Sequence, residues 1–499
     1  MSILLSGLIE FVQQPLLFVL LILGIFFGMV FGAIPGLTAA LAVSLILPFT
    51  FAMSSTQGIT TLIAIYVGGI SGGLISAILL NIPGSPASLV TCFDGSPMAK
   101  AGRANDALTI GVFSSLIGGT ISAVCLVVIA PMLAKVSLMF GAWEYFAMGI
   151  MGLGVVVSLS SGGLTKGFIS AVIGLLLAMV GMDSVSSVRR LTFGFWQLDA
   201  GLDSLDVLMG LFALTEILTQ VRTLNQRFNT IDPGRVRPWP TRAMMKGTGK
   251  TMLTGSIIGT FIGILPGIGQ TTASLFSYST AMQTSKNPEK FGTGCTEGLV
   301  ASETANNACC GGALIPMLTL GVPGDLVTAL LLGGLVVHGL QPGPLLFTTS
   351  TRVIAVIFAA FFLSNIFMYV MEMGLMKVFI KLLKVPMNLL FPIIMVMCVV
   401  GTITVNNRLF DSWVLFVVGI VGYILIAAKF PLPPIVIGFI LGSIIENNFR
   451  TALIANQGNF MSLFSKPIAV GFLIFTVVMV ALPIILSKMS AKKKAAEGV

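Results

Sequence analysis

Four Pro-Gly pairs interrupt hydrophobic segments of this chain, and they are the positions where ion-binding chemistry is most easily built. The pairs are Pro35-Gly36, Pro83-Gly84, Pro266-Gly267 and Pro323-Gly324. Proline removes a backbone donor and glycine admits left-handed geometry, so a helix broken there leaves free N–H groups at one new end and free C=O groups at the other. The N–H end attracts a carboxylate, whereas carbonyl oxygens suit Na⁺ or another hard cation.

Neutral polar side chains accompany the breaks and can hold an ion without an opposing buried charge that would slow its release. The alternative is that each pair is a helix kink whose neighbouring hydroxyls bond their own backbone. Because four pairs recur in the same order, we favour a binding role. The predicted substrate site consists of Pro35, Gly36, Thr38, Asn81, Pro83, Gly84, Ser85, Ser88, Pro266, Gly267, Gln270, Thr271, Pro323 and Gly324.

A carboxylate and two amides form a second candidate site. Glu303, Asn306 and Asn307 share one face if their segment is helical. The group can bind a cation, accept a proton or clamp a moving helix, and structural anchoring is the alternative. Ionisable groups inside a membrane are functional candidates by default. We add Asp325, which directly follows the fourth break, to this predicted cation-binding set.

Other polar residues have simpler interpretations. Asp94 is expected to cap a helix or turn before Gly95, and His338, the one histidine, is expected to be structural. The six cysteines show no metal-ligand spacing and are interpreted as small packing residues.

Transmembrane helices must position all of these side chains. The 499 residues are 56% hydrophobic and 9% charged, whereas an ordinary soluble domain carries about 25% charged residues. Apolar segments long enough for a ~30 Å hydrocarbon core recur along the chain. The clearest are Pro15–Val30, Leu108–Ala134, Lys166–Met182, Val353–Val370, Trp413–Ala428 and Ile468–Leu486. Alternating, barrel-like segments are absent from the sequence, so a helical bundle is expected.

The order of the breaks indicates a duplicated unit, since Pro266 and Pro323 repeat Pro35 and Pro83 at nearly the same offset. We therefore divide the chain into a first repeat (1–221), a basic linker (222–250) and a second repeat (251–499). The predicted fold is an all-α polytopic membrane protein with about a dozen transmembrane helices in two repeats. Each repeat contains Pro-Gly-broken helices or re-entrant hairpins, and polar connectors are expected near 84–106 and 183–206.

The placement of basic residues predicts the orientation in the membrane. The linker carries Arg222, Arg227, Arg235, Arg237, Arg242, Lys246 and Lys250, and the chain ends with Lys488, Lys492, Lys493 and Lys494. By the positive-inside rule both segments are cytoplasmic. The first Lys or Arg is Lys100, so nothing comparable holds the N-terminus inside, and we favour inverted repeats. Nucleic-acid binding is not expected, because these charges flank membrane spans.

Five segments resemble the large membrane subunit of tripartite tricarboxylate transporters. They are residues 78–88, 93–103, 303–308, 315–324 and 338–344, which read ILLNIPGSPAS, FDGSPMAKAGR, ETANNA, IPMLTLGVPG and HGLQPGP. The resemblance extends over roughly residues 15–485. It implies a bacterial inner-membrane protein that works with a small membrane subunit and a periplasmic solute-binding protein. It also implies carboxylate substrates, citrate among them, and cation symport with Na⁺, or H⁺, as the coupling ion.

The chain departs from the family pattern at two of the breaks. The first break continues with Thr38-Ala39, where the family usually has Gly-Pro, and the fourth is followed by Asp325 in place of a small or hydroxyl residue. The extra carboxylate at Asp325 can alter the cation site, disfavour a trianionic substrate or face a loop. The identity of the carboxylate therefore stays open.

The sequence thus predicts a carboxylate carrier that works by alternating access. An elevator-like motion is expected only by analogy with transporters that have paired broken hairpins. A stand-alone carrier or an ion channel is the alternative, and a homodimer is left open. A membrane enzyme is not expected, because the HExxH and GxSxG motifs are absent from the sequence. No organic cofactor or structural metal is expected.

Overall fold

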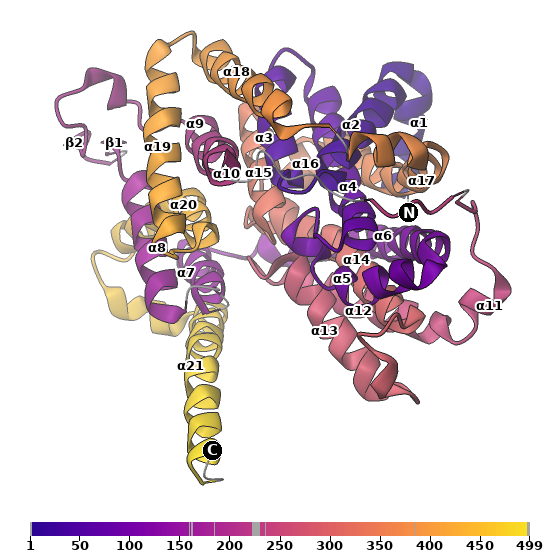
Figure 1. The fold of residues 1–499 in the computed structure, drawn as a ribbon. Helices are drawn as coiled ribbons and strands as arrows, with labels where there is room; N and C mark the ends of the chain where they lie inside the picture. The colour runs from indigo at the N-terminus through magenta and orange to yellow at the C-terminus, as the bar shows by residue number, and fades with distance from the viewer. Residues whose placement is uncertain are drawn as a thin grey trace. The chain divides into compact units, whose positions relative to one another are not determined.

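The computed structural model describes residues 2–158, 160, 163–183, 185–221, 230–234, 236–383 and 385–496, and leaves the side chains of 405 and 482–496 undescribed. The predicted basic positions Arg222, Arg227 and Arg235, and the side chains of the C-terminal lysines, lie outside this description. Nearly every described element is a helix, and the described strands are β1 (Gly181–Met182) and β2 (Arg189–Arg190). The prediction of an all-α membrane protein is confirmed (Figure 1).

The chain forms two compact units. Unit 1 contains residues 1–135 and 205–423, and unit 2 contains residues 136–204 and 424–499. Each unit contains residues from both halves of the sequence, so the boundaries of the compact units differ from those of the predicted repeats and linker. The predicted repeats and linker remain a sequence-based proposal.

The elements that lie wholly or mainly in unit 1 are α1 (Ser2–Gln13), α2 (Pro15–Ala33), α3 (Ala39–Thr50), α4 (Ser55–Leu80), η1 (Pro86–Ser88), α5 (Thr91–Met98), η2 (Ala99–Arg103), α6 (Ala104–Ser137), α9 (Ser204–Met209), η4 (Gly210–Leu214), α10 (Thr215–Gln220), α11 (Arg242–Met245), α12 (Thr248–Ile264), α13 (Gly269–Thr284), η6 (Pro288–Lys290), α14 (Thr296–Leu320), α15 (Leu326–Val337), α16 (Leu346–Thr349), α17 (Thr351–Leu382), α18 (Met387–Asn406) and α19 (Leu409–Ala427). Unit 2 contains α7 (Ala142–Ser158), α8 (Leu164–Ala178), β1, β2, η3 (Trp196–Leu198), α20 (Leu432–Ala455), η7 (Phe460–Ser465) and α21 (Pro467–Ala496).

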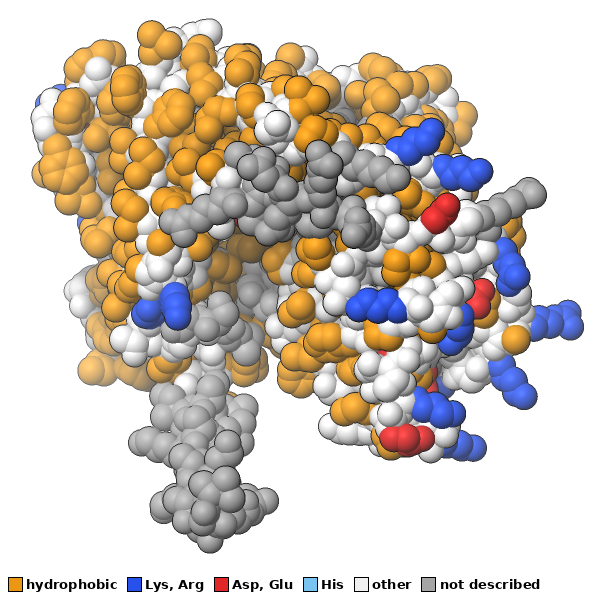
Figure 2. Space-filling view, viewed as in Figure 1, with side chains coloured by type: hydrophobic (Ala, Val, Ile, Leu, Met, Phe, Trp, Pro, Cys, Tyr) orange, Lys and Arg blue, Asp and Glu red, His pale blue; other side chains and the backbone are white. Residues whose placement is uncertain are grey.

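Seven of the described helices are long and apolar enough to cross a membrane, and six shorter apolar helices have 10–17 residues. Their outward faces are apolar as well. On α19, the exposed side chains Leu409, Trp413, Val417 and Ile420 follow the helical period along one face. Figure 2 shows hydrophobic side chains over much of the visible surface, with Lys and Arg gathered near the segment from α11 to α13. This distribution fits a chain whose helices face lipid.

Two sequence-based boundaries are wrong. The predicted polar connector near 84–106 is largely helical: α5, η2 and α6 follow one another from Thr91 to Ser137, with a kink at Gly102, where φ is 77°. Thr91, Asp94 and Ser96 are buried among helices of unit 1, whereas Lys100 and Arg103 are exposed. The predicted span Lys166–Met182 also ends early, since α8 stops at Ala178 and Met182 belongs to β1.

Glycine stripes bring α2 against α4. Gly24, Gly28 and Gly32 recur every fourth residue of α2, and a Cβ added at Gly32 would lie 2.1 Å from the Gly69 carbonyl oxygen. Contacts advance along both helices together, from Gly24 beside Ala64 to Gly32 beside Gly69, so the two helices are parallel. Small residues allow this approach of backbones, as expected for helices packed in lipid.

The same stripe occurs in the second half. Gly255, Gly259 and Gly263 of α12 face α14, and a Cβ at Gly263 would lie 2.4 Å from the Cys309 carbonyl oxygen. The shorter helices α3 and α13 follow the first and third breaks and pack against both long helices of their own half. Each half therefore contains a parallel pair of long helices connected through a shorter one.

The two halves run in opposite directions. Tyr66, near the middle of α4, contacts Asp325 beyond the end of α14. Conversely, Glu303, early in α14, contacts Thr91 beyond the end of α4. The helices α4 and α14 are therefore antiparallel, which is the inverted arrangement favoured by the sequence.

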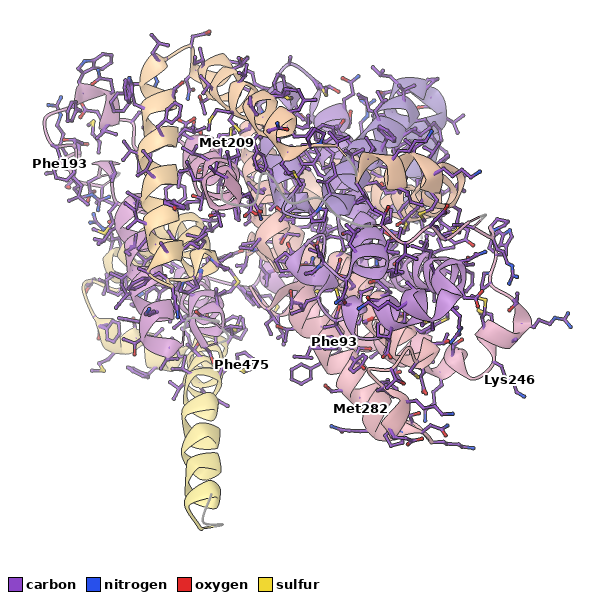
Figure 3. The ribbon with its side chains drawn as sticks, viewed as in Figure 1. Phe93, Phe193, Met209, Lys246, Met282 and Phe475 are labelled. Carbon is purple, nitrogen blue, oxygen red and sulfur yellow. The ribbon has the colours of Figure 1, made fainter. Side chains whose placement is uncertain are left out.

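An ion-pair network joins the β1–β2 segment of unit 2 to α20. Arg190 and Arg450 both contact Asp183 and Glu446, and the Arg450–Asp183 distance is 2.7 Å. Asp183 Oδ1 also accepts hydrogen bonds from the backbone N–H groups of Val185 and Ser186. Beyond this anchored base, Phe193 projects outward and is 81% exposed (Figure 3).

The glycine contacts predict a sharp difference between helical positions. Replacing Gly32 or Gly263 with Ala would bring the new Cβ into a steric clash with a backbone carbonyl oxygen of the neighbouring helix. Each variant should therefore lose about 1–3 kcal/mol of the free energy of unfolding through overpacking. Gly374→Ala in α17 is the matched control, because its added Cβ meets no atom within 4 Å. Thermal unfolding of the purified protein in detergent measures the difference. Equal midpoints for all three variants would contradict the close-packed stripes.

The Asp183 network predicts acid sensitivity in unit 2. Hydrogen bonds from the Ser186 and Val185 amides, with help from Arg450, hold the pKa of Asp183 well below its usual range. A lowered folded-state pKa stabilises the fold above the unfolded value of about 3.9, and this contribution is lost as the pH falls below it. The protection factors of the amides of residues 181–183 and 185–199, which correct for the intrinsic pH dependence of hydrogen exchange, should therefore fall below about pH 4. Asp183→Asn should exchange faster at neutral pH and show a flatter pH response; an unchanged profile would refute the assignment.

Candidate functional site

The two breaks of each half meet inside unit 1. A Cβ added at Gly84 would lie 2.1 Å from the Gly32 carbonyl oxygen, and one at Gly324 would lie 2.5 Å from that of Gly263. In the second half the contact includes a backbone hydrogen bond of 2.8 Å from Gly267 N–H to Gly324 C=O. The structure therefore brings together the predicted residues around Pro35 and Pro83, and separately those around Pro266 and Pro323.

Side chains of this chain already cap the helices that follow the first and fourth breaks. Thr38 Oγ1 accepts a hydrogen bond of 3.1 Å from Leu41 N–H at the start of α3. Asp325 caps α15, where its Oδ1 accepts hydrogen bonds from Thr328 N–H (2.6 Å) and from the Thr328 hydroxyl (2.7 Å). These two helices also pack against each other. Their N-terminal ends are therefore poor sites for an added anion.

Asp325 is fully engaged and does not face a loop. The side chain is 3% exposed, and its Oδ2 accepts hydrogen bonds from Tyr66 Oη and Gln270 Nε2. Gln270 also donates to Tyr66 Oη at 2.8 Å. The carboxylate thus links α4, α13 and α15, and this polar cluster explains why the chain tolerates a charge directly after the fourth break.

The other two breaks lack such caps. Ser85 precedes η1 and Ile268 precedes α13, and neither side chain caps its helix. Ser85 and Ser88 are buried, and neither hydroxyl has a hydrogen-bond partner within the described part of the chain. Both hydroxyls lie close to Gly73, whose missing side chain leaves them space. Because η1 packs against α13, the two uncapped segments adjoin each other, as the two capped segments do.

The predicted Glu303 group is buried between helices. Glu303 accepts hydrogen bonds from Thr91 and, at 3.1 Å, from the Ser115 hydroxyl. Asn306 lies beside this carboxylate, although neither of its side-chain polar atoms makes a well-formed hydrogen bond to a described residue. Asn307 instead donates to the Glu303 backbone carbonyl at 3.2 Å. The structure therefore brings Glu303 and Asn306 together and leaves Asn307 in a helix-internal role.

Asn81 and Thr271 are peripheral to these clusters. Asn81 is exposed and ends α4 with a left-handed φ of 58°, which is a position at which Asn is favourable. Thr271 is half-buried in the first turn of α13.

Asp94 has a larger role than the local cap expected from the sequence. Its Oδ1 accepts hydrogen bonds from the backbone N–H groups of Gly292, Gly294 and Cys295, at 2.7–3.0 Å, and its Oδ2 accepts one from Tyr278. These partners belong to the second half of the sequence. Asp94 therefore ties the two halves together. His338 lies at the end of α15, where Nε2 is 3.3 Å from Thr50 Oγ1.

Sequence reasoning missed Tyr66, Ser115 and Glu372. Tyr66 and Ser115 had no distinguishing local motif, since their roles depend on partners more than 180 residues away. Glu372 did have a signal, because it is a single carboxylate within the apolar helix α17. No group of three or more His, Cys, Asp or Glu side chains suited to a metal ion occurs in the described ranges.

Paired broken helices in inverted halves, with buried polar groups at the breaks, are the architecture of secondary transporters. A family model, the tripartite tricarboxylate transporter TctA family, matches residues 18–437. The chain belongs to this family.

The chain is also similar to two proteins from Agrobacterium vitis. An uncharacterized 52.8 kDa protein in the TAR-I ttuC' 3' region is 36% identical over 449 residues, which cover 89% of each chain. An uncharacterized protein in the TAR-II ttuC' 3' region is 36% identical over 233 residues, which cover 46% of this chain and 96% of the relative. No solved structure matches the chain.

The Asp325 cluster predicts a graded response to substitution. Asp325→Ala should lower the free energy of unfolding by roughly 2–4 kcal/mol, because α15 loses its cap and buried donors lose their acceptor. Asp325→Asn should cost less than half as much, since the amide oxygen still caps α15 while Gln270 and Tyr66 can reorient. Thermal unfolding in detergent tests this order, and equal losses for both variants would argue against the capping role.

Proposed function

We propose that this chain is the permease subunit of a carboxylate uptake system that depends on a solute-binding protein and is driven by symport of a cation, Na⁺ before H⁺. Membership of the TctA family supports the subunit assignment. The observation that carries the binding chemistry is the meeting of two broken helices in each half, which places backbone N–H and C=O groups inside unit 1.

Within this proposal, the carboxylate binds on the uncapped side, at Ser85, Ser88 and the start of α13. The buried hydroxyls of Ser85 and Ser88 have no described partner, so a ligand that accepts hydrogen bonds would satisfy them. By contrast, Thr38 and Asp325 occupy the equivalent positions on the other side. The Asp325 charge would also repel an anion there, and this favours a single anion site. A di- or tricarboxylate is the proposed substrate class, with citrate as the first member to test.

The proposed mechanism is alternating access. Unit 1 contains all four breaks, and we assign it as the carrier in an elevator-like cycle. The partners are a small membrane subunit and a periplasmic solute-binding protein, and the location is a bacterial inner membrane with the 222–250 linker and the C-terminus cytoplasmic. A stand-alone carrier or channel is the competing function, and it differs in needing no binding protein.

Uptake by proteoliposomes tests the function directly. Vesicles containing this chain and its small partner should accumulate radiolabelled citrate or another di- or tricarboxylate only with a binding protein outside and an inward Na⁺ gradient. Two further conditions distinguish the coupling ions. Uptake that is lost when choline replaces Na⁺ indicates coupling to Na⁺, and uptake driven by a pH gradient in the absence of Na⁺ indicates coupling to protons. Saturable uptake that ignores both the gradient and the binding protein would instead establish the stand-alone alternative.

The same assay tests the proposed anion site. Ser88→Ala should raise the KM for the carboxylate roughly 10-fold or more, because one hydrogen bond to a charged group is lost. Ser256→Ala is the matched control, since this buried hydroxyl donates to its own helix at Met252 C=O (2.8 Å). An unchanged KM in Ser88→Ala, with normal folding, would move the site away from the second break.

A further inference from the structure

A second buried carboxylate lies close to Glu303. Glu372 of α17 is fully buried, and its Oε2 accepts a hydrogen bond of 2.7 Å from the Ser71 hydroxyl of α4. Its other oxygen, Oε1, has no hydrogen-bond partner among the residues that the structure describes. The charges of Glu372 and Glu303 are near enough to interact. No role is assigned to Glu372 by the motifs or by the proposed substrate site.

The helix packing places the two carboxylates in one bundle. Glu303 is bound by Ser115 of α6, and one turn further along α6 a Cβ at Gly119 would collide with Asn365 of α17. Glu372 follows Asn365 by two turns and therefore lies on the same face of α17. The pair is thus enclosed by α4, α6, α14 and α17, with α5 contributing Thr91.

Asn306 contributes two buried polar atoms that no described protein group pairs. It is fully buried on the same face of α14 as Glu303, lies beside that carboxylate, and has two unsatisfied polar atoms, Oδ1 and Nδ2. A buried amide without partners is costly, and in native proteins such a group usually contacts water or an ion. The Asn306 carbonyl oxygen and the free Glu372 oxygen are ligand types that alkali cations prefer.

The charge balance gives an independent argument. None of the ion pairs in the described part of the chain involves Glu303 or Glu372. The groups recorded next to them are neutral: the Thr91, Ser115 and Ser71 hydroxyls, the Asn306 amide and the half-buried Cys92 thiol. Both carboxylates can ionise together in this low-dielectric interior only if a positive charge compensates them.

We propose that one monovalent cation completes this pair, and that Glu372 is a ligand of the coupling site together with Glu303 and Asn306. The proposal deepens the proposed symport and rests on it. It also removes Asp325 from the cation-binding set, because each oxygen of that carboxylate already accepts two hydrogen bonds from protein groups, whereas each oxygen of Glu303 accepts one. The chemistry required is a single positive charge, which either Na⁺ or a proton can supply.

Cation binding by the purified chain tests the proposal without carboxylate or partners. Thermal unfolding is followed while NaCl replaces choline chloride at constant ionic strength, since a ligand that binds only the folded state raises its midpoint. Na⁺ should stabilise the wild type, and Glu372→Gln should raise its apparent dissociation constant roughly 10- to 100-fold through loss of a charged ligand. Glu372→Asp, which keeps the charge, should retain part of the effect.

Glu297→Gln is the matched control. Glu297 lies in the first turn of α14, and its oxygens accept hydrogen bonds from the Thr251 and Ser285 hydroxyls, so this variant should bind Na⁺ as the wild type does. If Na⁺ does not stabilise the wild type, a proton is the remaining cation. The wild type should then show an infrared band of a protonated carboxylic acid that disappears in Glu372→Gln.

Two results would overturn the inference. The first is an unchanged Na⁺ dissociation constant in a correctly folded Glu372→Gln protein. The second is a wild type with neither Na⁺ stabilisation nor a protonated-carboxyl band sensitive to Glu372. Because binding is measured without uptake, failure of carboxylate transport would refute the proposed function and leave this site standing. Normal Na⁺-coupled uptake by Glu372→Gln would refute the site and leave the function standing.

Discussion

The need to pair every backbone polar group inside a hydrocarbon layer governs this structure. Unbroken helices satisfy the requirement by themselves, but the four Pro-Gly breaks do not, and lipid cannot supply the missing partners. In each half the two broken segments pack against each other, and in the second half the backbone N–H of Gly267 donates to the backbone carbonyl of Gly324. Glycine stripes on α2 and α12 let each long helix approach its parallel neighbour closely enough for the breaks to meet. The site and the packing that encloses it therefore have the same origin.

The two halves contain corresponding broken helices that run in opposite directions, but the side chains at the breaks differ. Thr38 and Asp325 cap the helices on one side, whereas Ser85 and Ile268 leave the corresponding ends uncapped on the other. On the capped side, an anion would meet helix N-termini already occupied by side chains and the carboxylate of Asp325. On the uncapped side, it would meet the buried hydroxyls of Ser85 and Ser88. In the proposed function, this chemical difference between the two sides confines the carboxylate to one of them.

Buried carboxylates in the described part of unit 1 serve different purposes according to their partners. Asp94 and Asp325 accept several hydrogen bonds and act as links between segments distant in sequence. Glu372 accepts one from Ser71, and its second oxygen is left without a described partner. Asp94 and Asp325 each accept four hydrogen bonds, whereas Glu303 accepts two and Glu372 accepts one, so the two glutamates keep acceptor capacity for the proposed cation. The number of donors therefore separates structural from candidate functional acids better than burial does.

The amino-acid sequence alone determined the membrane class, the helical architecture and the family, because apolar length and short motifs are properties of contiguous sequence; its Pro-Gly spacing also predicted the duplication. It also identified Glu303 with Asn306, since residues three apart share a helix face. The tertiary structure decided which breaks meet, that 84–106 is helical, that Asp325 is a cap and that Glu372 approaches Glu303. Most of these features depend on contacts between helices far apart in the chain, such as the one between Thr91 of α5 and Glu303 of α14. The local sequence pattern does not show which distant helix supplies a hydrogen-bond partner.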